Sequence, residues 1–81
     1  MACYSEDGLH AYLGWDKGLY FTARDSEDES FGPLFTLADA ALTGPITGGV
    51  WVAPQEDVIF YCSPGPGKEL GSGRKLWMIR F

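Results

Sequence analysis

The side chains best suited to covalent or metal chemistry are one histidine, His10, and two cysteines, Cys3 and Cys62. A cysteine thiolate paired with a histidine base is a common catalytic arrangement, and His10 lies near Cys3 in the sequence. A surface histidine with two buried thiols explains the same residues more simply. These three residues match no zinc-binding spacing, and two cysteines without a secretion signal do not make a disulfide framework. We therefore predict no catalytic residues, no metal and no cofactor.

A glycine-rich segment over residues 65–75 is the strongest local motif. Backbone N–H groups beside glycines, together with cationic side chains, can bind an anion. The segment is not a P-loop, which needs glycine where Cys62 stands and serine or threonine where Glu69 stands. A flexible hairpin loop is the simpler interpretation. The alternative is a small-ligand or nucleotide site, with the residues Gly67, Lys68, Arg74, Lys75 and Trp77.

Charge is uneven along this chain, whose net charge is −5. Residues 1–67 hold ten acidic side chains against Lys17 and Arg24, a balance of −8, whereas residues 68–81 carry four basic side chains against Glu69, a balance of +3. The overall acidity disfavours direct nucleic-acid binding, because that draws on clustered Lys and Arg. The expected partner is instead a protein with a basic surface.

The run 25–30 holds four carboxylates in five residues, which predicts an exposed loop. Solubility alone explains such a loop. The functional interpretation is that Glu27, Asp28 and Glu29, with acidic residues at other turns, present negative potential to the basic partner. In that role the protein would mimic nucleic acid.

Twelve aromatic residues are many for a core of this size, so we expect some of them to reach the surface. Tyr12 and Tyr20 would share a face of a symmetric hairpin, and Tyr61 and Trp77 would lie on neighbouring strands. Such rings either anchor a protein contact or complete a two-sided core. Because an 81-residue core is thin, we also expect a homodimer.

Alternation of apolar residues predicts strands over 9–15, 19–24 and 75–81, and β-prone runs predict strands over 50–52 and 58–62. Residues 1–4 form a further short strand in this interpretation. The segment Thr36-Leu37-Ala38-Asp39 resembles a capping box, which predicts a helix of about two turns before Gly44-Pro45. The expected fold is one α+β domain over 1–81. It has an antiparallel sheet of five to six strands in the order β-β-β-α-β-β-β, with the helix packed on one face.

The N-terminus has neither a basic start nor an apolar stretch, and no apolar run is long enough to span a membrane, so we predict a cytoplasmic protein with no membrane contact. Small acidic domains without a catalytic set suit a non-catalytic inhibitor or adaptor, of the kind that phages and mobile elements encode. This origin is a hypothesis from size and the scarcity of motifs.

Overall fold

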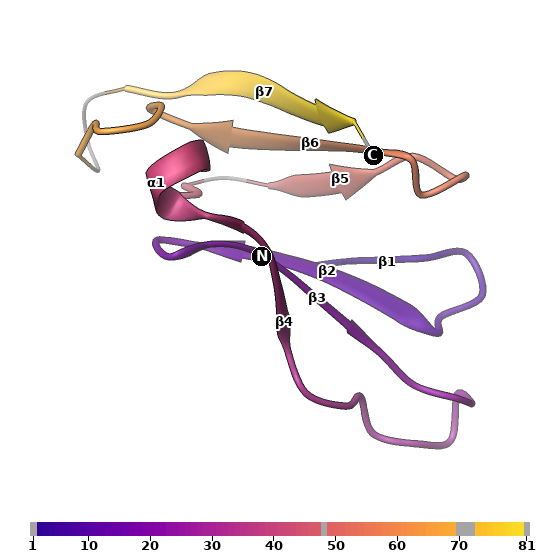
Figure 1. Cartoon of the computed structure of the whole chain (residues 1–81). Coiled ribbons are helices and arrows are strands. Elements are labelled where there is room, and N and C mark those ends of the chain that lie inside the picture. Colours follow the sequence, from indigo (N-terminus) through magenta and orange to yellow (C-terminus); the bar gives the residue numbers. More distant parts are fainter. Residues whose placement is uncertain (1, 48, 70–72, 81) are drawn as a thin grey trace.

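In the residues that the computed structural model describes, 2–47, 49–69 and 73–80, seven antiparallel strands form two sheets with one very short helix (Figure 1). Sheet A contains, in spatial order, β1 (Ala2–Tyr4), β2 (His10–Trp15), β3 (Gly18–Ala23) and β4 (Phe35–Asp39). Sheet B contains β5 (Val50–Val52), β6 (Val58–Ser63) and β7 (Lys75–Arg80). The helix α1 (Ala40–Thr43) lies at one end of the two layers.

Two sheets, with four strands before α1 and three after it in the described residues, replace the single sheet of five to six strands that we expected from the sequence. The strands predicted over 9–15 and 19–24 are confirmed as a β-hairpin, in which β2 pairs with β3. Those predicted over 50–52 and 58–62 form a second β-hairpin, in which β5 pairs with β6. The segment after α1 carries the chain from one layer to the other, and it places Ile46 between the sheets. Stacking lets each sheet bury one face against the other, which a single sheet with one short helix cannot do. The buried core consists of Tyr12, Leu19, Ala38, Ile46, Val50, Val52, Ile59 and Tyr61.

The helix predicted from Thr36 is wrong over most of its length, because residues 35–39 form strand β4 on the open edge of β3. Ala38 lies opposite Leu19 there and is buried. Asp39 is the N-cap residue rather than the third helical residue, and its carboxylate accepts a 2.9 Å hydrogen bond from the N–H of Ala41. Pairing with β3 gives partners to four of the five residues of this segment, all except Leu37, whereas a two-turn helix is marginal in water.

The two layers lie close together at Gly14 in β2, where side chains from Ile46 and Val50 pack against the backbone of sheet A. A Cβ atom there would lie 2.7 Å from side-chain carbons of Ile46 and Val50, so only glycine leaves room for sheet B. Gly44, which follows α1 at the start of the segment that leads to sheet B, has a φ of 75°. A Cβ atom on Gly44 would overlap the carbonyl oxygen of Gly65. These contacts fix the spacing between the sheets.

The described part of the chain contains no helix long and apolar enough to cross a membrane.

Candidate functional site

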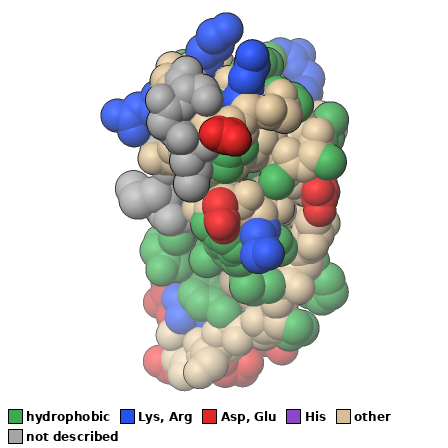
Figure 2. Space-filling model, turned by 90° about the vertical axis from the view of Figure 1, so that its left-hand side faces the viewer, with side chains coloured by type: hydrophobic (Ala, Val, Ile, Leu, Met, Phe, Trp, Pro, Cys, Tyr) green, Lys and Arg blue, Asp and Glu red, His purple; other side chains and the backbone are tan. Residues whose placement is uncertain are grey.

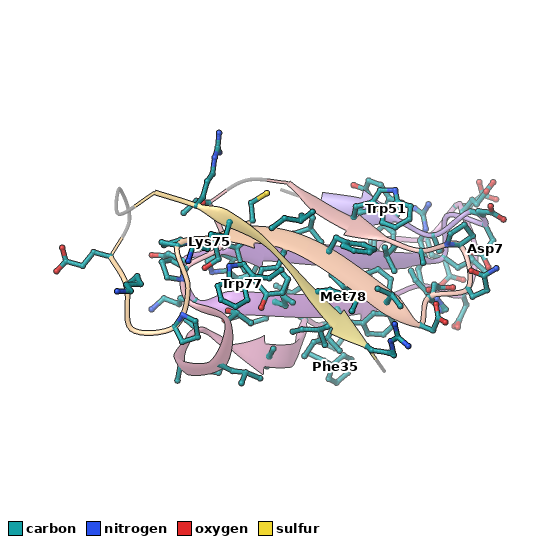
Figure 3. The ribbon with its side chains drawn as sticks, turned by 90° about the horizontal axis from the view of Figure 1, so that it is seen from above. Asp7, Phe35, Trp51, Lys75, Trp77 and Met78 are labelled. Carbon is teal, nitrogen blue, oxygen red and sulfur yellow. The ribbon has the colours of Figure 1, made fainter. Side chains whose placement is uncertain are left out.

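Acidic side chains gather at one end of the two-layer fold. The β1–β2 turn, the β3–β4 loop and the β5–β6 turn meet there, because β2 and β6 both begin at this end and β3 finishes there. Eight of the eleven carboxylates of the chain belong to these three segments: Glu6, Asp7, Asp25, Glu27, Asp28, Glu29, Glu56 and Asp57. We call these eight residues the acidic end. Asp7, labelled in Figure 3, marks its position.

The β1–β2 turn holds Asp7 in its ionised form. Its Oδ1 atom accepts hydrogen bonds from the hydroxyl of Ser5, at 2.6 Å, and from the N–H of Leu9, at 3.0 Å. The bond from Ser5 is the main reason that the pKa of Asp7 lies below its ordinary value, and the Leu9 bond adds to it. Asp7 is exposed, so its charge faces solvent.

Arg24 organises the acidic loop through backbone atoms rather than carboxylates. Its Nε donates to the carbonyl oxygen of Gly8, at 2.9 Å, and its Nη1 donates to that of Glu29, at 3.2 Å. The guanidinium lies 4.4 Å from the ring centre of Phe31, a cation–π geometry. The bond to Gly8 ties the β3–β4 loop to the β1–β2 turn.

The predicted site residues Glu27, Asp28 and Glu29 are exposed in this loop. Across residues 2–47, 49–69 and 73–80, the single carboxylate within ion-pair distance of a basic side chain is that of Glu56, beside His10. The carboxylates of Glu27, Asp28 and Glu29 thus have no cationic partner in these segments. Arg80, which pairs with Val58, lies at the same end of sheet B. The acidic end thus has eight carboxylates and two nearby arginines, Arg24 and Arg80, and Arg24 bonds backbone carbonyl oxygens.

The contact between His10, Tyr12 and Glu56 links the two sheets at the acidic end. His10 Nδ1 lies 2.6 Å from Glu56 Oε1, and the Tyr12 hydroxyl donates to the same oxygen at 2.8 Å. Glu56 has a φ of 58°, a left-handed conformation that is uncommon for a residue other than glycine. Burial is the main cause of the raised pKa of Tyr12, and the hydrogen bond to Glu56 raises it further. The phenol therefore remains a hydrogen-bond donor well above neutral pH.

Phe21 completes this group, since its ring centre lies 5.4 Å from that of His10 and 5.2 Å from that of Tyr12. A hollow of about 200 Å³ beside it is lined by Tyr12, Phe21, Leu37 and Glu56. Sequence reasoning placed His10 at the surface and Glu56 in a turn, and it missed their contact. The two residues are 46 positions apart, and no local pattern connects them.

The expectation that Tyr12 and Tyr20 share a face is wrong. The hairpin pairs Tyr12 with Phe21 and Leu13 with Tyr20, so the two tyrosines point to opposite sides of sheet A. Tyr12 is buried in the core, and Tyr20 stacks on Trp15 with ring centres 4.1 Å apart. They cannot form one aromatic platform. By contrast, Tyr61 and Trp77 are direct cross-strand partners, as predicted.

The basic residues of the alternative ligand site lie away from the acidic end. Gly67, Lys68, Arg74 and Lys75 are exposed, and residues 70–72 of the glycine-rich loop lie outside the described residues. Trp77 donates its indole N–H to the carbonyl oxygen of Ser63, at 2.9 Å. Figure 2, which shows the end that carries α1, has a group of Lys and Arg side chains at the top, over sheet B, and a group of Asp and Glu side chains at the base, with both kinds of side chain between them.

The thiols of Cys3 and Cys62 are free and lie in different sheets. The imidazole of His10 bonds a carboxylate rather than either thiol. Within the described residues, no group of three His, Cys, Asp or Glu side chains is arranged to hold a metal ion.

Sheet B has an apolar outer face. Trp51, Phe60 and Met78 are aligned across its three strands, and the rings of Trp51 and Phe60 have centres 5.4 Å apart. Leu76 pairs with Cys62 in the neighbouring row. Trp51, Leu76 and Met78 are 52%, 69% and 49% exposed. Figure 3 looks down on this face and labels Trp51 and Met78. We call these five residues the outer face.

The fold and these surfaces define a small, mostly β domain of two antiparallel sheets. No family model, no curated protein and no solved structure matches the chain.

Proposed function

We propose that this protein is a non-catalytic protein-binding domain, an inhibitor or adaptor, that presents its acidic end to a basic protein surface. The convergence of three acidic turns carries this proposal, because it concentrates charge that the sequence spreads over more than fifty residues. A surface of one sign steers an oppositely charged partner and speeds association.

The fixed shape of the acidic end supports binding rather than solubility alone. Arg24 and the hydrogen bonds of Asp7 hold the turns in place without neutralising the exposed carboxylates of the β3–β4 loop. A loop whose backbone is held in position loses less conformational freedom when a partner binds. A partner that ordinarily binds nucleic acid has the required basic surface, which is the basis for proposing mimicry.

The non-catalytic part of the proposal rests on how the reactive side chains are placed. Glu56 Oε1 bonds both the imidazole of His10 and the hydroxyl of Tyr12. The two thiols lie in separate sheets. Neither thiol is therefore paired with the imidazole as a base.

The test is a matched pair of triple variants. Glu27→Gln, Asp28→Asn and Glu29→Gln together remove three charges from the acidic end. Asp16→Asn, Asp39→Asn and Glu69→Gln together remove three charges elsewhere, and the amide that replaces the carboxylate of Asp39 retains an oxygen to cap α1. Partners are captured from a cell lysate, purified singly and titrated against each protein at low and high salt.

We expect the first variant to bind a purified partner about tenfold more weakly at low salt and to lose most of the salt dependence. The second variant should bind the partner with nearly the same affinity and salt dependence as the parent protein. Equal weakening of both variants, or no weakening of either, would reject the acidic end as the contact. Release of the partner by competing DNA would support mimicry, and a partner that binds no nucleic acid would contradict it.

The alternative function is binding of a small anionic ligand at Gly67, Lys68, Arg74, Lys75 and Trp77. Exposed cations beside glycines favour it, whereas the indole N–H of Trp77 is already bonded to Ser63. A thermal-shift screen with nucleotides tests this alternative. It predicts stabilisation by more than about 1 kcal/mol at saturating nucleotide, lost in Lys68→Ala.

A further inference from the structure

We propose that the hollow lined by Tyr12, Phe21, Leu37 and Glu56 binds the ammonium group of a lysine side chain from the basic partner. This inference rests on the proposed function and assigns the chemistry that the partner must present. The hollow borders the acidic end through Glu56, so a partner held there by charge brings its side chains close to it.

The size of the hollow fits one side chain. Its volume of about 200 Å³ lies below the range of roughly 300–1,000 Å³ that is typical of sites for drug-sized ligands or cofactors. Strand β4 provides one wall at the irregularity in its pairing, where Leu19 lies opposite Ala38 but Tyr20 lies opposite Thr36. Leu37 is the extra residue at this β-bulge, a feature that redirects side chains next to binding sites.

The lining selects a cation. Two aromatic rings, Tyr12 and Phe21, lie with centres 5.2 Å apart, and the carboxylate of Glu56 lies beside them. Aromatic faces attract an ammonium group within about 6 Å, and a partly buried carboxylate attracts it more strongly than an exposed one. Leu37 offers an apolar contact for the methylene groups of lysine.

The hydrogen bonds of Glu56 favour lysine over arginine. A guanidinium prefers to bond both oxygens of a carboxylate in a planar fork. Here Oε1 already accepts the bonds from His10 and Tyr12, while Oε2 has no hydrogen-bond partner among the residues of the described segments. One available oxygen suits the compact charge of an ammonium group.

The experiment titrates isotope-labelled protein with a blocked Gly-Lys-Gly tripeptide and follows backbone amide shifts by NMR. It is run at low salt, where the attraction between charged groups is least screened. Blocked Gly-Arg-Gly and the Nε-acetyl-lysine peptide are the comparison probes. We expect the lysine peptide to shift residues around Tyr12, Phe21, Leu37 and Glu56, and both comparison peptides to bind at least about fivefold more weakly.

Two variants separate the hollow from general attraction to the acidic end. Glu56→Gln keeps an oxygen for Tyr12 but removes the charge, and should weaken lysine-peptide binding by about tenfold. The neighbouring Asp57→Asn removes the same charge outside the hollow and should change binding by less than about twofold. Leu37→Trp fills the hollow without changing the charge. It should abolish the shifts, and its amide spectrum shows whether it folds.

Shifts spread over all three acidic turns and reduced equally by Glu56→Gln and Asp57→Asn would overturn the lysine site, as would no shift at low salt. The proposed function would survive either result, because the charge-neutralised triple variants test it separately. If those variants leave partner binding unchanged while the lysine peptide still occupies the hollow, the proposed function fails and the ammonium site remains.

Discussion

The hydroxyl of Ser63 donates a 2.8 Å hydrogen bond to the carbonyl oxygen of Thr43, and both residues are fully buried. The same hydroxyl oxygen accepts a bond from the N–H of Gly65, at 3.0 Å. Ser63 thus joins the end of α1, which follows sheet A, to the last residue of β6 in sheet B. We predict that Ser63→Ala destabilises the protein by about 1–3 kcal/mol, because it leaves a buried carbonyl and a buried N–H without their partner.

Urea unfolding followed by tryptophan fluorescence measures this change. Ser30→Ala, at an exposed position of the β3–β4 loop, is the control and should leave the free energy of unfolding within about 0.5 kcal/mol of the parent. Equal stability of the two variants would show that the hydrogen bonds of Ser63 contribute nothing to the free energy of unfolding.

Gly14 sets the distance between the sheets, so Gly14→Ala should push Ile46 and Val50 aside. We expect a loss of about 1–3 kcal/mol in the free energy of unfolding, as for other overpacked cores. Gly49→Ala is the matched control, since a Cβ atom there would meet nothing within 4 Å. Adding Val50→Ala to Gly14→Ala should cost less than the sum of the two single changes, because the smaller side chain makes room for the new methyl group.

Local patterns in the sequence predicted the elements whose contacts are local. The hairpin over residues 9–24 follows from alternation, and its strands occur where expected. The sequence did not predict β4, because Thr36 and Asp39 have capping-box spacing while the edge of β3 offered backbone partners along the same segment. Helix propensity over a few residues is a weak preference that such pairing overrides.

The candidate site was predictable only in its charge. Exposure of Glu27, Asp28 and Glu29 follows from mutual repulsion of neighbouring carboxylates. These three residues lie near the turn that carries Glu56 because sheet B stacks on sheet A. The pattern of apolar residues along the sequence does not predict how the sheets stack. The contact between His10 and Glu56 and the opposite orientation of Tyr12 and Tyr20 depend likewise on stacking and on strand register.

Tyr12 makes stability sensitive to alkali. Its pKa in the folded protein is raised above the ordinary value of about 10, so between these two values the folded state binds more protons than the unfolded state. The contribution of Tyr12 to stability should therefore be constant below about pH 9 and fall as the pH rises above about 10. Tyr61, whose pKa burial also raises, acts in the same direction.

Urea unfolding at several alkaline pH values measures how steeply the free energy of unfolding falls with pH. Tyr12→Phe removes one ionisable group, so its stability should fall less steeply above about pH 10 than that of the parent protein. Parallel curves for the two proteins would contradict the link between Tyr12 and alkaline stability.

The free thiols predict that the protein does not depend on a disulfide. Cys3 and Cys62 belong to different sheets, and each is only partly buried. We expect a thiol reagent to modify both cysteines in the unfolded protein without prior reduction. The midpoint of thermal unfolding should be the same with and without a reductant. A lower midpoint under reducing conditions would show that the thiols form a stabilising bridge.

The outer face of sheet B is the surface that we propose for the homodimer. Its aligned Trp51, Phe60 and Met78 form an apolar strip across three strands, and the β5, β6 and β7 strands carry no acidic side chain. Burial against a second copy would add the apolar contact area that a thin core lacks. We predict that Trp51→Ser with Met78→Ser shifts the protein to the monomer in sedimentation equilibrium. Leu42→Ser, at another exposed apolar position, should leave the dimer intact. A parent protein that is monomeric at high concentration would reject self-association through this face and leave the acidic end as the proposed contact.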